Sequence, residues 1–257
     1  MSAGQGASGD AREPAVVEHP EPDGPETGSA LAVFAHPDDA EIAAGGTLAK
    51  WAAAGREVHL LVLTSGDRGS QDRRVERAEV ARVRGNETVE GARVMGLASA
   101  TVLDVHDGDL DNTTEIRAEV VRAIRRIRPA TVVSCDPTAW FFENRYYNHS
   151  DHRTAGAVAL DAVFPGAGNP HYFSDHLDEG LEPHDVPAVW LGWTLEPNHH
   201  EDITGFLDTK VAALAAHVSQ LAEGIAFFEE ELGKEAASAG ERSGVRHAEA
   251  FRVLALR

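Results

Sequence analysis

The chain has 257 residues and a formal net charge of −19, and 42% of its residues are hydrophobic. This composition permits a buried core of ordinary size, while the negative charge argues against binding to nucleic acid or to an anionic membrane surface. The single cysteine, Cys135, excludes an intramolecular disulfide, and nothing in the cysteine content requires an oxidising compartment.

The first 28 residues differ in composition from the rest of the chain. They are rich in Gly, Pro, Ser and Ala, and six acidic residues against Arg12 give them a net charge of −5. Such a segment buries too little apolar surface to fold, so we expect a disordered acidic tail over residues 1–28. We see neither a signal peptide nor an apolar stretch of the roughly 18 residues that a membrane helix needs. A cytoplasmic protein without membrane contact is the resulting expectation.

The remaining residues, 29–257, show alternating strand and helix patterns with no internal repeat or linker. Short apolar runs predict strands, and longer segments with helical periodicity predict helices. In chain order we expect strand 30–35, helix 41–54, strand 58–63, helix 75–95, strand 101–105, helix 114–128, strand 131–135, helix 151–163, strand 189–193, helix 209–220 and strand 251–256. This alternation favours a single α/β domain with a mostly parallel sheet and helices on both faces.

A first cluster of polar residues, from His36 to Glu41, directly follows the first predicted strand. In open α/β sheets, ligands bind just beyond the carboxyl ends of the strands. If the next helix begins at about Pro37, the three-residue spacing turns His36 and Asp39 toward one point. Asp38 then points elsewhere and is free for proton transfer. The alternative is that an aspartate caps the helix and His36 is an ordinary loop residue.

A second cluster, residues 148–152, lies at the start of the helix predicted after strand 131–135. It contains His149 and His152, again three residues apart. Zinc prefers imidazole and carboxylate ligands, and a catalytic site leaves one position open for water. With His36, Asp39 and His152 as ligands to one zinc per chain, His149 and Asp38 remain as acid and base. The alternative is that Ser150 or Asp151 caps the helix. Two such clusters at strand-to-helix junctions favour the metal site.

Other motifs indicate no further cofactor. The acidic stretch at 107–111 resembles a calcium loop, but its twelfth position is Ala118 rather than the glutamate that such a loop requires. No G-x-G-x-x-G pattern follows the first strand, which argues against a dinucleotide cofactor.

The motifs as a set resemble the PIG-L/LmbE-like deacetylases, which include N-acetylglucosaminyl deacetylases and mycothiol-pathway amidases. The resemblance extends from about residue 30 to the C-terminus, and its two specific motifs are HPDD at 36–39 and HSDH at 149–152. Softer matches are GGTLAKWAAAG at 45–55, LTSGDRG at 63–69, DGDL at 107–110, HVSQ at 217–220 and AEAFR at 248–252.

The resemblance implies a Rossmann-like fold with a mononuclear zinc site held by His36, Asp39 and His152. It also implies that Asp38 is the general base and that His149 is an acid or stabilises the oxyanion, and Asp151 either hydrogen-bonds His149 or caps its helix. Substrate contacts are expected from Arg84, Arg68 and Tyr147, the last of these in an aromatic loop over residues 138–147.

The sequence therefore predicts a zinc-dependent hydrolase that cleaves an N-acyl amide, most simply an N-acetyl group, of an amino sugar or related small conjugate. The alternatives are a non-catalytic, metal-containing carbohydrate-binding protein and a metal-dependent esterase. The expected partner is the small-molecule substrate, and the sequence is compatible with a homo-oligomer.

Overall fold

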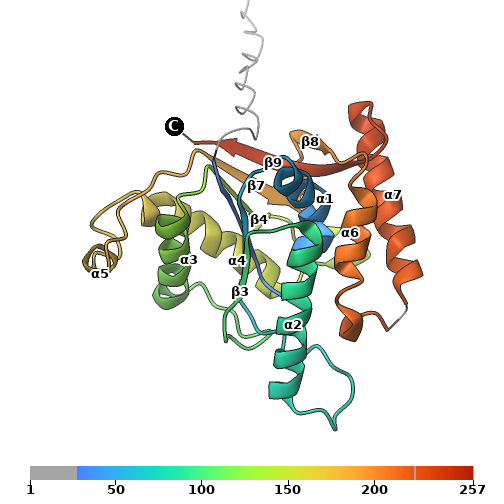
Figure 1. The fold of residues 1–257 in the computed structure, drawn as a ribbon, viewed down its shortest axis with the longest axis horizontal. Coiled ribbons are helices and arrows are strands. Elements are labelled where there is room, and N and C mark those ends of the chain that lie inside the picture. The colour runs from blue at the N-terminus through green and yellow to red at the C-terminus, as the bar shows by residue number, and fades with distance from the viewer. Residues whose placement is uncertain (1–27, 223, 257) are drawn as a thin grey trace, which may run out of the picture.

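The computed structural model describes residues 28–222 and 224–256. The acidic tail predicted at 1–28 therefore lies outside the described residues except for Gly28. The centre of the molecule is a seven-stranded sheet with the strand order β3-β2-β1-β4-β7-β9-β8 (Figure 1). Its strands are β1 (Ala30–Phe34), β2 (Val58–Val62), β3 (Ser99–Val102), β4 (Thr131–Cys135), β7 (Ala188–Gly192), β8 (His199–Asp202) and β9 (Ala248–Ala255).

The first five of these strands in spatial order run parallel, from β3 to β7, and β9 and β8 add an antiparallel edge. The helices are α1 (Asp39–Ala53), α2 (Arg77–Met95), α3 (Thr114–Ile127), α4 (Ser150–Asp161), α5 (Asp175–Asp178), α6 (Leu207–Leu214) and α7 (Ile225–Ser243). The α/β class and the mostly parallel sheet predicted from the sequence are confirmed.

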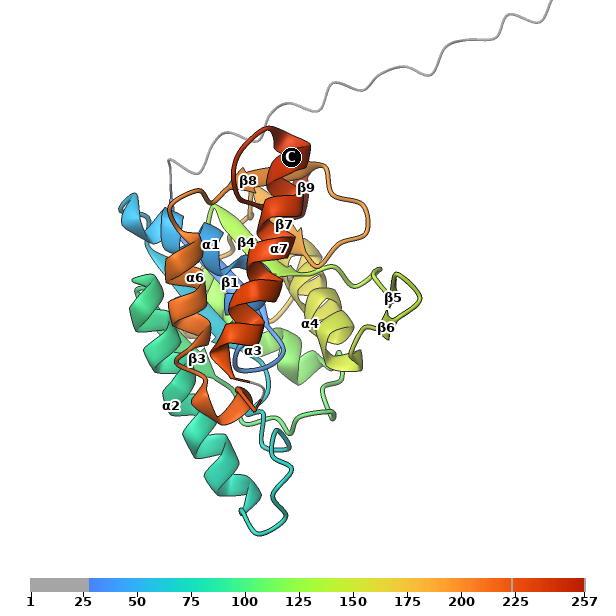
Figure 2. The same cartoon turned by 90° about the vertical axis from the view of Figure 1, so that its right-hand side faces the viewer.

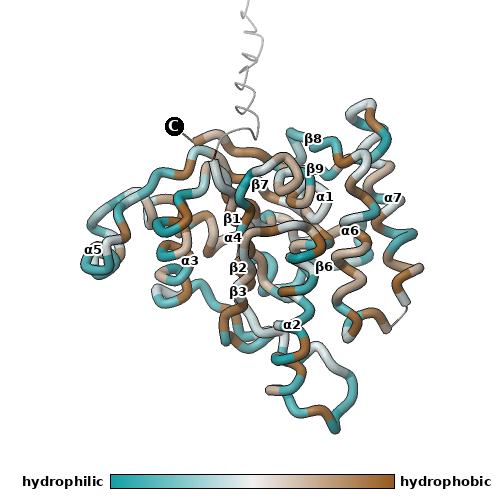
Figure 3. The backbone as a smooth tube through the Cα atoms, in the orientation of Figure 1, coloured by the Kyte–Doolittle hydropathy of each residue, from teal (hydrophilic) through white to brown (hydrophobic). Residues whose placement is uncertain are grey.

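Two hydrophobic cores, one on each face of the sheet, explain why β1 is an uninterrupted apolar run. Ala32 and Phe34 pack with α1 on one face, while Leu31 and Val33 pack with α3 and α4 on the other. A parallel strand covered on both faces needs apolar side chains at every position rather than at alternate ones. Figure 3 shows the hydrophobic colour concentrated on these central strands, with hydrophilic segments outside them.

Several boundaries differ from those predicted. The third strand begins at Ser99 instead of Thr101, and the helix expected over 209–220 ends at Leu214, followed by the short 3₁₀ turn η2 (Val218–Gln220). Helix α7 was not predicted, because its buried residues are only Leu232, Ala236 and Gly240, which give a weak apolar pattern. None of the helices in the described part of the chain has the length and hydrophobicity of a membrane span.

The two glycines within α2 have different surroundings, and this leads to a matched pair of predictions. A Cβ at Gly91 would lie 2.5 Å from Glu41 Oε1 and 3.1 Å from His217 Nε2, whereas a Cβ at Gly85 would meet no atom within 4 Å. Glu41 and His217 form a buried ion pair at 3.2 Å, so neither side chain has room to retreat. We expect Gly91→Ala to lower the free energy of unfolding by about 1–3 kcal/mol and Gly85→Ala to raise it by about 0.5–1 kcal/mol.

Urea denaturation of the two variants beside the wild type measures these changes. Equal stabilisation by both substitutions would show that α1, α2 and the His217 segment do not pack as closely as the structure indicates.

Candidate metal centre

The two polar clusters meet where the strand order reverses direction. After β1, the chain adds β2 and β3 on one side of that strand. It then returns and places β4 on the other side of β1. The loops that follow β1 and β4 therefore diverge from the same edge, and this topological switch point is where open α/β sheets bind ligands. His36 follows β1, and the segment after β4 leads to His149 and His152 at the start of α4.

His36, Asp39 and His152 come together at this point, with ligand atoms that all lie within 4.8 Å of one another. Asp39 is central: its Oδ2 lies 3.4 Å from His36 Nδ1, and its Oδ1 lies 3.2 Å from His152 Nε2. Two imidazoles and one carboxylate form the donor set of many catalytic zinc sites. The structure thus brings together the three residues that we predicted as metal ligands.

The route by which His36 reaches Asp39 differs from the predicted one. Helix α1 begins at Asp39 rather than near Pro37, and the preceding Asp38 has a left-handed φ of 98°. A tight turn brings the two residues together, because the His36 N–H donates to Asp39 Oδ2 at 2.8 Å. The expected proximity is therefore correct, but it arises from this turn and not from one turn of a helix.

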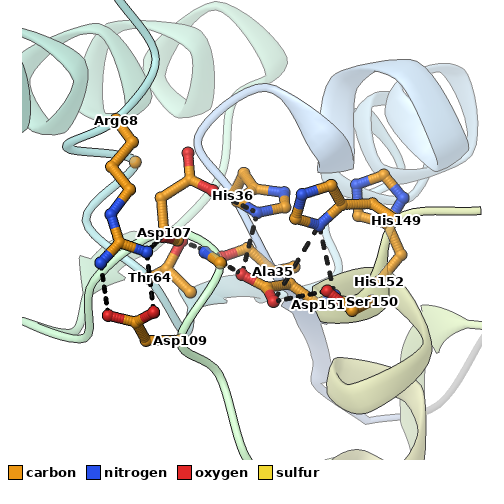
Figure 4. Close-up of polar contacts among 12 residues, drawn as sticks. Ala35, His36, Thr64, Arg68, Asp107, Asp109, His149, Ser150, Asp151 and His152 are labelled. Carbon is orange, nitrogen blue, oxygen red and sulfur yellow. Dashed lines mark hydrogen bonds and ion pairs between the residues drawn. The ribbon is translucent and has the colours of Figure 1, made fainter.

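Outer contacts orient both imidazoles toward Asp39. His36 Nε2 lies 3.3 Å from both Asp151 Oδ2 and Asp107 Oδ1 (Figure 4), and His152 Nδ1 lies 2.9 Å from Asn148 Oδ1. If these nitrogens carry the protons, the lone pairs of His36 Nδ1 and His152 Nε2 face Asp39. Metal-binding histidines commonly donate their second N–H to such oxygen atoms, so the residues present fit a divalent metal ion.

The electrostatics of the centre also favour a cation. Burial lowers the pKa of His36, but the charge of Asp39 and the hydrogen bonds that Asp107 and Asp151 accept from the ring outweigh burial and raise that pKa to about 12. Burial likewise opposes ionisation of Asp39, yet His152 and His36 hold its pKa well below the usual range. Three carboxylates thus surround one imidazole, and this arrangement requires a positive charge, which a proton or a metal ion can supply.

Asp38 faces a different partner, the buried guanidinium of Arg84. Asp38 Oδ2 lies 3.3 Å from Arg84 Nη2, which also donates to the Pro37 carbonyl at 2.6 Å, and Nη1 donates to the Gly66 carbonyl at 3.0 Å. Burial raises the pKa of Asp38 to about 7, while Arg84 opposes the increase. The sequence predicted a substrate contact for Arg84, but the structure buries this side chain behind Asp38, with Nη1 and Nη2 directed at backbone carbonyls and at Asp38.

We predict from this geometry that Arg84 is a positioning residue, and its removal tests this role. Arg84→Met leaves Asp38 without its cation and the Pro37 carbonyl without the Arg84 donor, whereas the Gly66 carbonyl still accepts from the Gly69 N–H. The substitution should cost about 3–5 kcal/mol of stability, as expected for one half of a buried pair. Steady-state kinetics should show a loss in kcat with little change in KM. Arg82→Met on the exposed face of the same helix is the control, since Arg82 pairs only with Glu79. A raised KM with unchanged kcat would instead support substrate contact.

His149 lies next to the centre but does not belong to the set of His36, Asp39 and His152. Its ring centroid lies 4.9 Å from that of His36, and its Nδ1 accepts a hydrogen bond from the Asp151 backbone N–H at 3.2 Å. Burial and the charge of His36 lower the pKa of His149. The neutral ring then carries its proton on Nε2 and can donate a hydrogen bond from that atom.

Asp151 has a different partner from the expected one. Its carboxylate contacts His36 and accepts from the Gly108 N–H at 2.7 Å, but lies 4.0 Å from His149 Nδ1. The N-cap of α4 is His149 rather than Ser150 or Asp151. Asp151 therefore acts on the first predicted ligand, His36, and not on the predicted acid.

A cavity of about 490 Å³ opens beside Asp39 and His152. A short hairpin of β5 (Phe141–Phe142) and β6 (Tyr146–Tyr147), which projects beside α4 in Figure 2, supplies one wall. Phe142 and Tyr146 line the cavity, whereas Tyr147 is 73% exposed. Because successive strand residues point to opposite faces, the predicted substrate contact at Tyr147 falls on the outer face and its neighbour Tyr146 takes the inner position.

The predicted contact residue Arg68 also lies outside the cavity. Its guanidinium pairs with Asp109 at 2.5 Å and donates to the Asp107 carbonyl (Figure 4). Four residues near the centre were not predicted to take part: Asp107, Asn148, Trp193 and Glu235. The DGDL motif was the one available signal for Asp107, and the position of Asn148 four residues before His152 was the signal for Asn148.

The chain is similar to a known protein family and to several known proteins. The family model described as "PIG-L: GlcNAc-PI de-N-acetylase" matches residues 31–163. The chain is 37% identical over 225 residues to a diacetylchitobiose deacetylase from Thermococcus kodakarensis, covering 87% of this chain and 82% of that protein. It is 29% identical to a 1D-myo-inositol 2-acetamido-2-deoxy-alpha-D-glucopyranoside deacetylase from Rhodococcus opacus, covering 74% of this chain and 81% of that one.

A solved structure is similar in fold over nearly the whole chain. The N,N'-diacetylchitobiose deacetylase from Pyrococcus horikoshii superposes with a TM-score of 0.84 at 30% identity, covering 91% of this chain and 87% of that one.

Proposed function

Because this chain belongs to the PIG-L family of de-N-acetylases, we propose that it is a zinc-dependent N-deacetylase of small acetamido sugars. The relatives are named for the removal of acetyl groups from diacetylchitobiose and from an acetamido-glucopyranoside of inositol. Hydrolysis of such an amide forms a bond from a water oxygen to the acetyl carbon, breaks the carbon–nitrogen bond, and yields acetate and the free amine.

We assign the metal to His36 Nδ1, Asp39 and His152 Nε2. A divalent ion at this position supplies Lewis-acid chemistry, which lowers the pKa of water and polarises the amide carbonyl. Asp107, Asp151 and Asn148 hold the two imidazoles in the orientation that presents these nitrogens. Zinc is the natural choice for a site of two imidazoles and one carboxylate.

Asp38 is assigned as the general base. It follows the first ligand by two residues, and it faces Arg84 rather than the imidazoles. A base is most efficient when its pKa lies close to the working pH, and burial brings the pKa of Asp38 to about 7. Its left-handed backbone is an uncommon conformation for a residue other than glycine, as is often found where a side chain must be aimed at a reacting group.

His149 is assigned to the developing charge on the amide. Its Nε2–H can donate to the carbonyl oxygen as that atom becomes negative. The leaving nitrogen must also gain a proton, which either the protonated Asp38 or His149 can deliver.

The observation that carries this proposal is the pair of imidazoles whose free nitrogens face one buried carboxylate, with Asp38 beside them. The test is acetate release from N,N'-diacetylchitobiose and N-acetylglucosamine by the metal-free protein before and after addition of one equivalent of zinc. We expect release only after zinc addition. Zinc binding without acetate release from any acetamido sugar would indicate a non-catalytic sugar-binding protein. Faster cleavage of matched acetate esters than of these amides would indicate an esterase.

A further inference from the structure

The cavity beside the metal centre receives one carboxylate from outside the family-matched segment. Glu235 belongs to α7, which follows the matched residues 31–163, and it lines the same cavity as Asp39 and His152. Within residues 28–222 and 224–256, no hydrogen bond or ion pair to the Glu235 carboxylate is present. Glu235 is an exposed residue where it lines the cavity. Partial desolvation raises the pKa of its carboxyl, although Lys210 opposes the increase. The free acceptor atoms of this carboxylate can bind donors on a ligand.

The other walls of the cavity are aromatic or aliphatic. Trp193 packs against His152 with ring centroids 4.8 Å apart and a tilt of 37° between the rings. The rings of Phe142 and Tyr146, 6.0 Å apart, lie on the hairpin. Ile42 completes the apolar lining. Flat aromatic faces accommodate the apolar C–H faces of a sugar ring, and a few polar groups then fix its orientation.

Negative side chains predominate among the charged residues that line the cavity. Asp39 and Glu235 contribute two carboxylates, whereas the residues that line the cavity in the described part of the chain include neither arginine nor lysine. The imidazoles and the proposed metal ion offset the charge of Asp39. Glu235 has only the more distant Lys210, which forms its ion pair with Glu249. A phosphate or carboxylate group on the ligand would meet an unpaired like charge, while hydroxyl groups would find an acceptor.

We propose that Glu235 is a specificity-determining residue that selects neutral, hydroxyl-rich acetamido sugars and rejects those that carry an anionic substituent. This inference rests on the proposed function, because it assumes that the acetamide lies at the metal centre and the rest of the sugar fills the aromatic cavity. It adds the class of substrate: the acetamido sugar is an uncharged mono- or oligosaccharide rather than a sugar phosphate.

The test compares N-acetylglucosamine with N-acetylglucosamine 6-phosphate, which differ only in the anionic group. Acetate release gives kcat/KM for the zinc-loaded wild type and the variants Glu235→Lys and Glu235→Gln. Calorimetric binding of both sugars to the zinc-loaded Asp38→Asn protein, with and without the Glu235 changes, gives a readout that does not depend on turnover. Glu241→Lys is the matched control, since Glu241 is an exposed residue of the same helix, six residues after Glu235, and does not line the cavity.

We expect the wild type to favour the neutral sugar by about tenfold or more, and Glu235→Lys to shift the ratio toward the phosphate by a similar factor, because like-charge repulsion is replaced by attraction. Glu235→Gln should give an intermediate ratio, and Glu241→Lys should leave the ratio unchanged at physiological salt. Equal ratios in Glu235→Lys and Glu241→Lys would overturn the role of Glu235. Binding of both sugars without acetate release would contradict the proposed function, and the ratio of the two affinities would still test the role of Glu235. Binding of neither sugar would contradict both proposals.

Discussion

Asp38→Asn is expected to reduce kcat by about 10²–10⁴-fold, the usual contribution of a general acid or base, while the protein retains its metal. The substitution preserves the shape of the side chain but removes the group that accepts the proton from water. The Asp38 carboxylate contacts Arg84 at 3.3 Å, whereas His36 and His152 both contact Asp39. The substitution of Asp38 should therefore leave the arrangement of His36, Asp39 and His152 intact. The measurements are steady-state acetate release and metal content of the purified variant.

The control for this variant is Asp109→Asn, which removes a carboxylate near the site that pairs with the surface residue Arg68. It should leave kcat within about twofold of the wild type, in line with the small value of exposed ion pairs. The wild-type rate should also fall as the pH falls through the pKa of Asp38, since only the ionised carboxylate accepts a proton. Normal turnover by Asp38→Asn would remove this residue from the proposed mechanism.

His152→Ala is expected to abolish stable zinc binding. The substitution deletes one of three proposed ligands, whereas Asn148→Ala removes only the oxygen that orients His152 at 2.9 Å. Loss of an outer-shell partner typically costs about 10–100-fold in metal affinity, so Asn148→Ala should weaken binding by this factor and His152→Ala by considerably more. Competition with a chromophoric chelator measures both affinities.

A histidine outside the centre serves as the control for this series. The His184 side chain donates from Nε2 to the Pro129 carbonyl at 2.9 Å, and His184→Ala should bind zinc as tightly as the wild type. If His152→Ala retained one tightly bound zinc per chain, the assigned ligand set would be wrong.

Local sequence signals predicted the elements that surround the site. The apolar run at β4 and the helix end at Gly96 agree with the structure residue for residue, because a buried strand and a glycine in the left-handed region are each specified locally. The beginning of α1 could not be predicted in this way. Asp38 has a left-handed backbone and contacts Arg84, 46 residues later in the chain, and no local pattern predicts such a contact.

The functional residues also divide into those that local sequence signals predict and those that depend on contacts between distant segments. Two His/Asp clusters after parallel strands were enough to predict the convergence at His36, Asp39 and His152. Glu235 lies nearly 200 residues from Asp39 on a helix with a weak apolar pattern, so its place in the cavity depends on packing between distant segments. The choice between Tyr146 and Tyr147 needed the register of the hairpin, since a shift of one residue exchanges the inner and outer faces.

The most direct test of the metal centre is anomalous X-ray diffraction from crystals of the zinc-loaded protein, recorded on both sides of the zinc absorption edge. We expect one anomalous peak per chain, about 2.0–2.2 Å from His36 Nδ1, His152 Nε2 and an Asp39 oxygen, with His36 Nε2 still directed at Asp107 and Asp151. A peak bound through His36 Nε2, or one located away from Asp39 and His152, would contradict the arrangement on which the proposed chemistry depends.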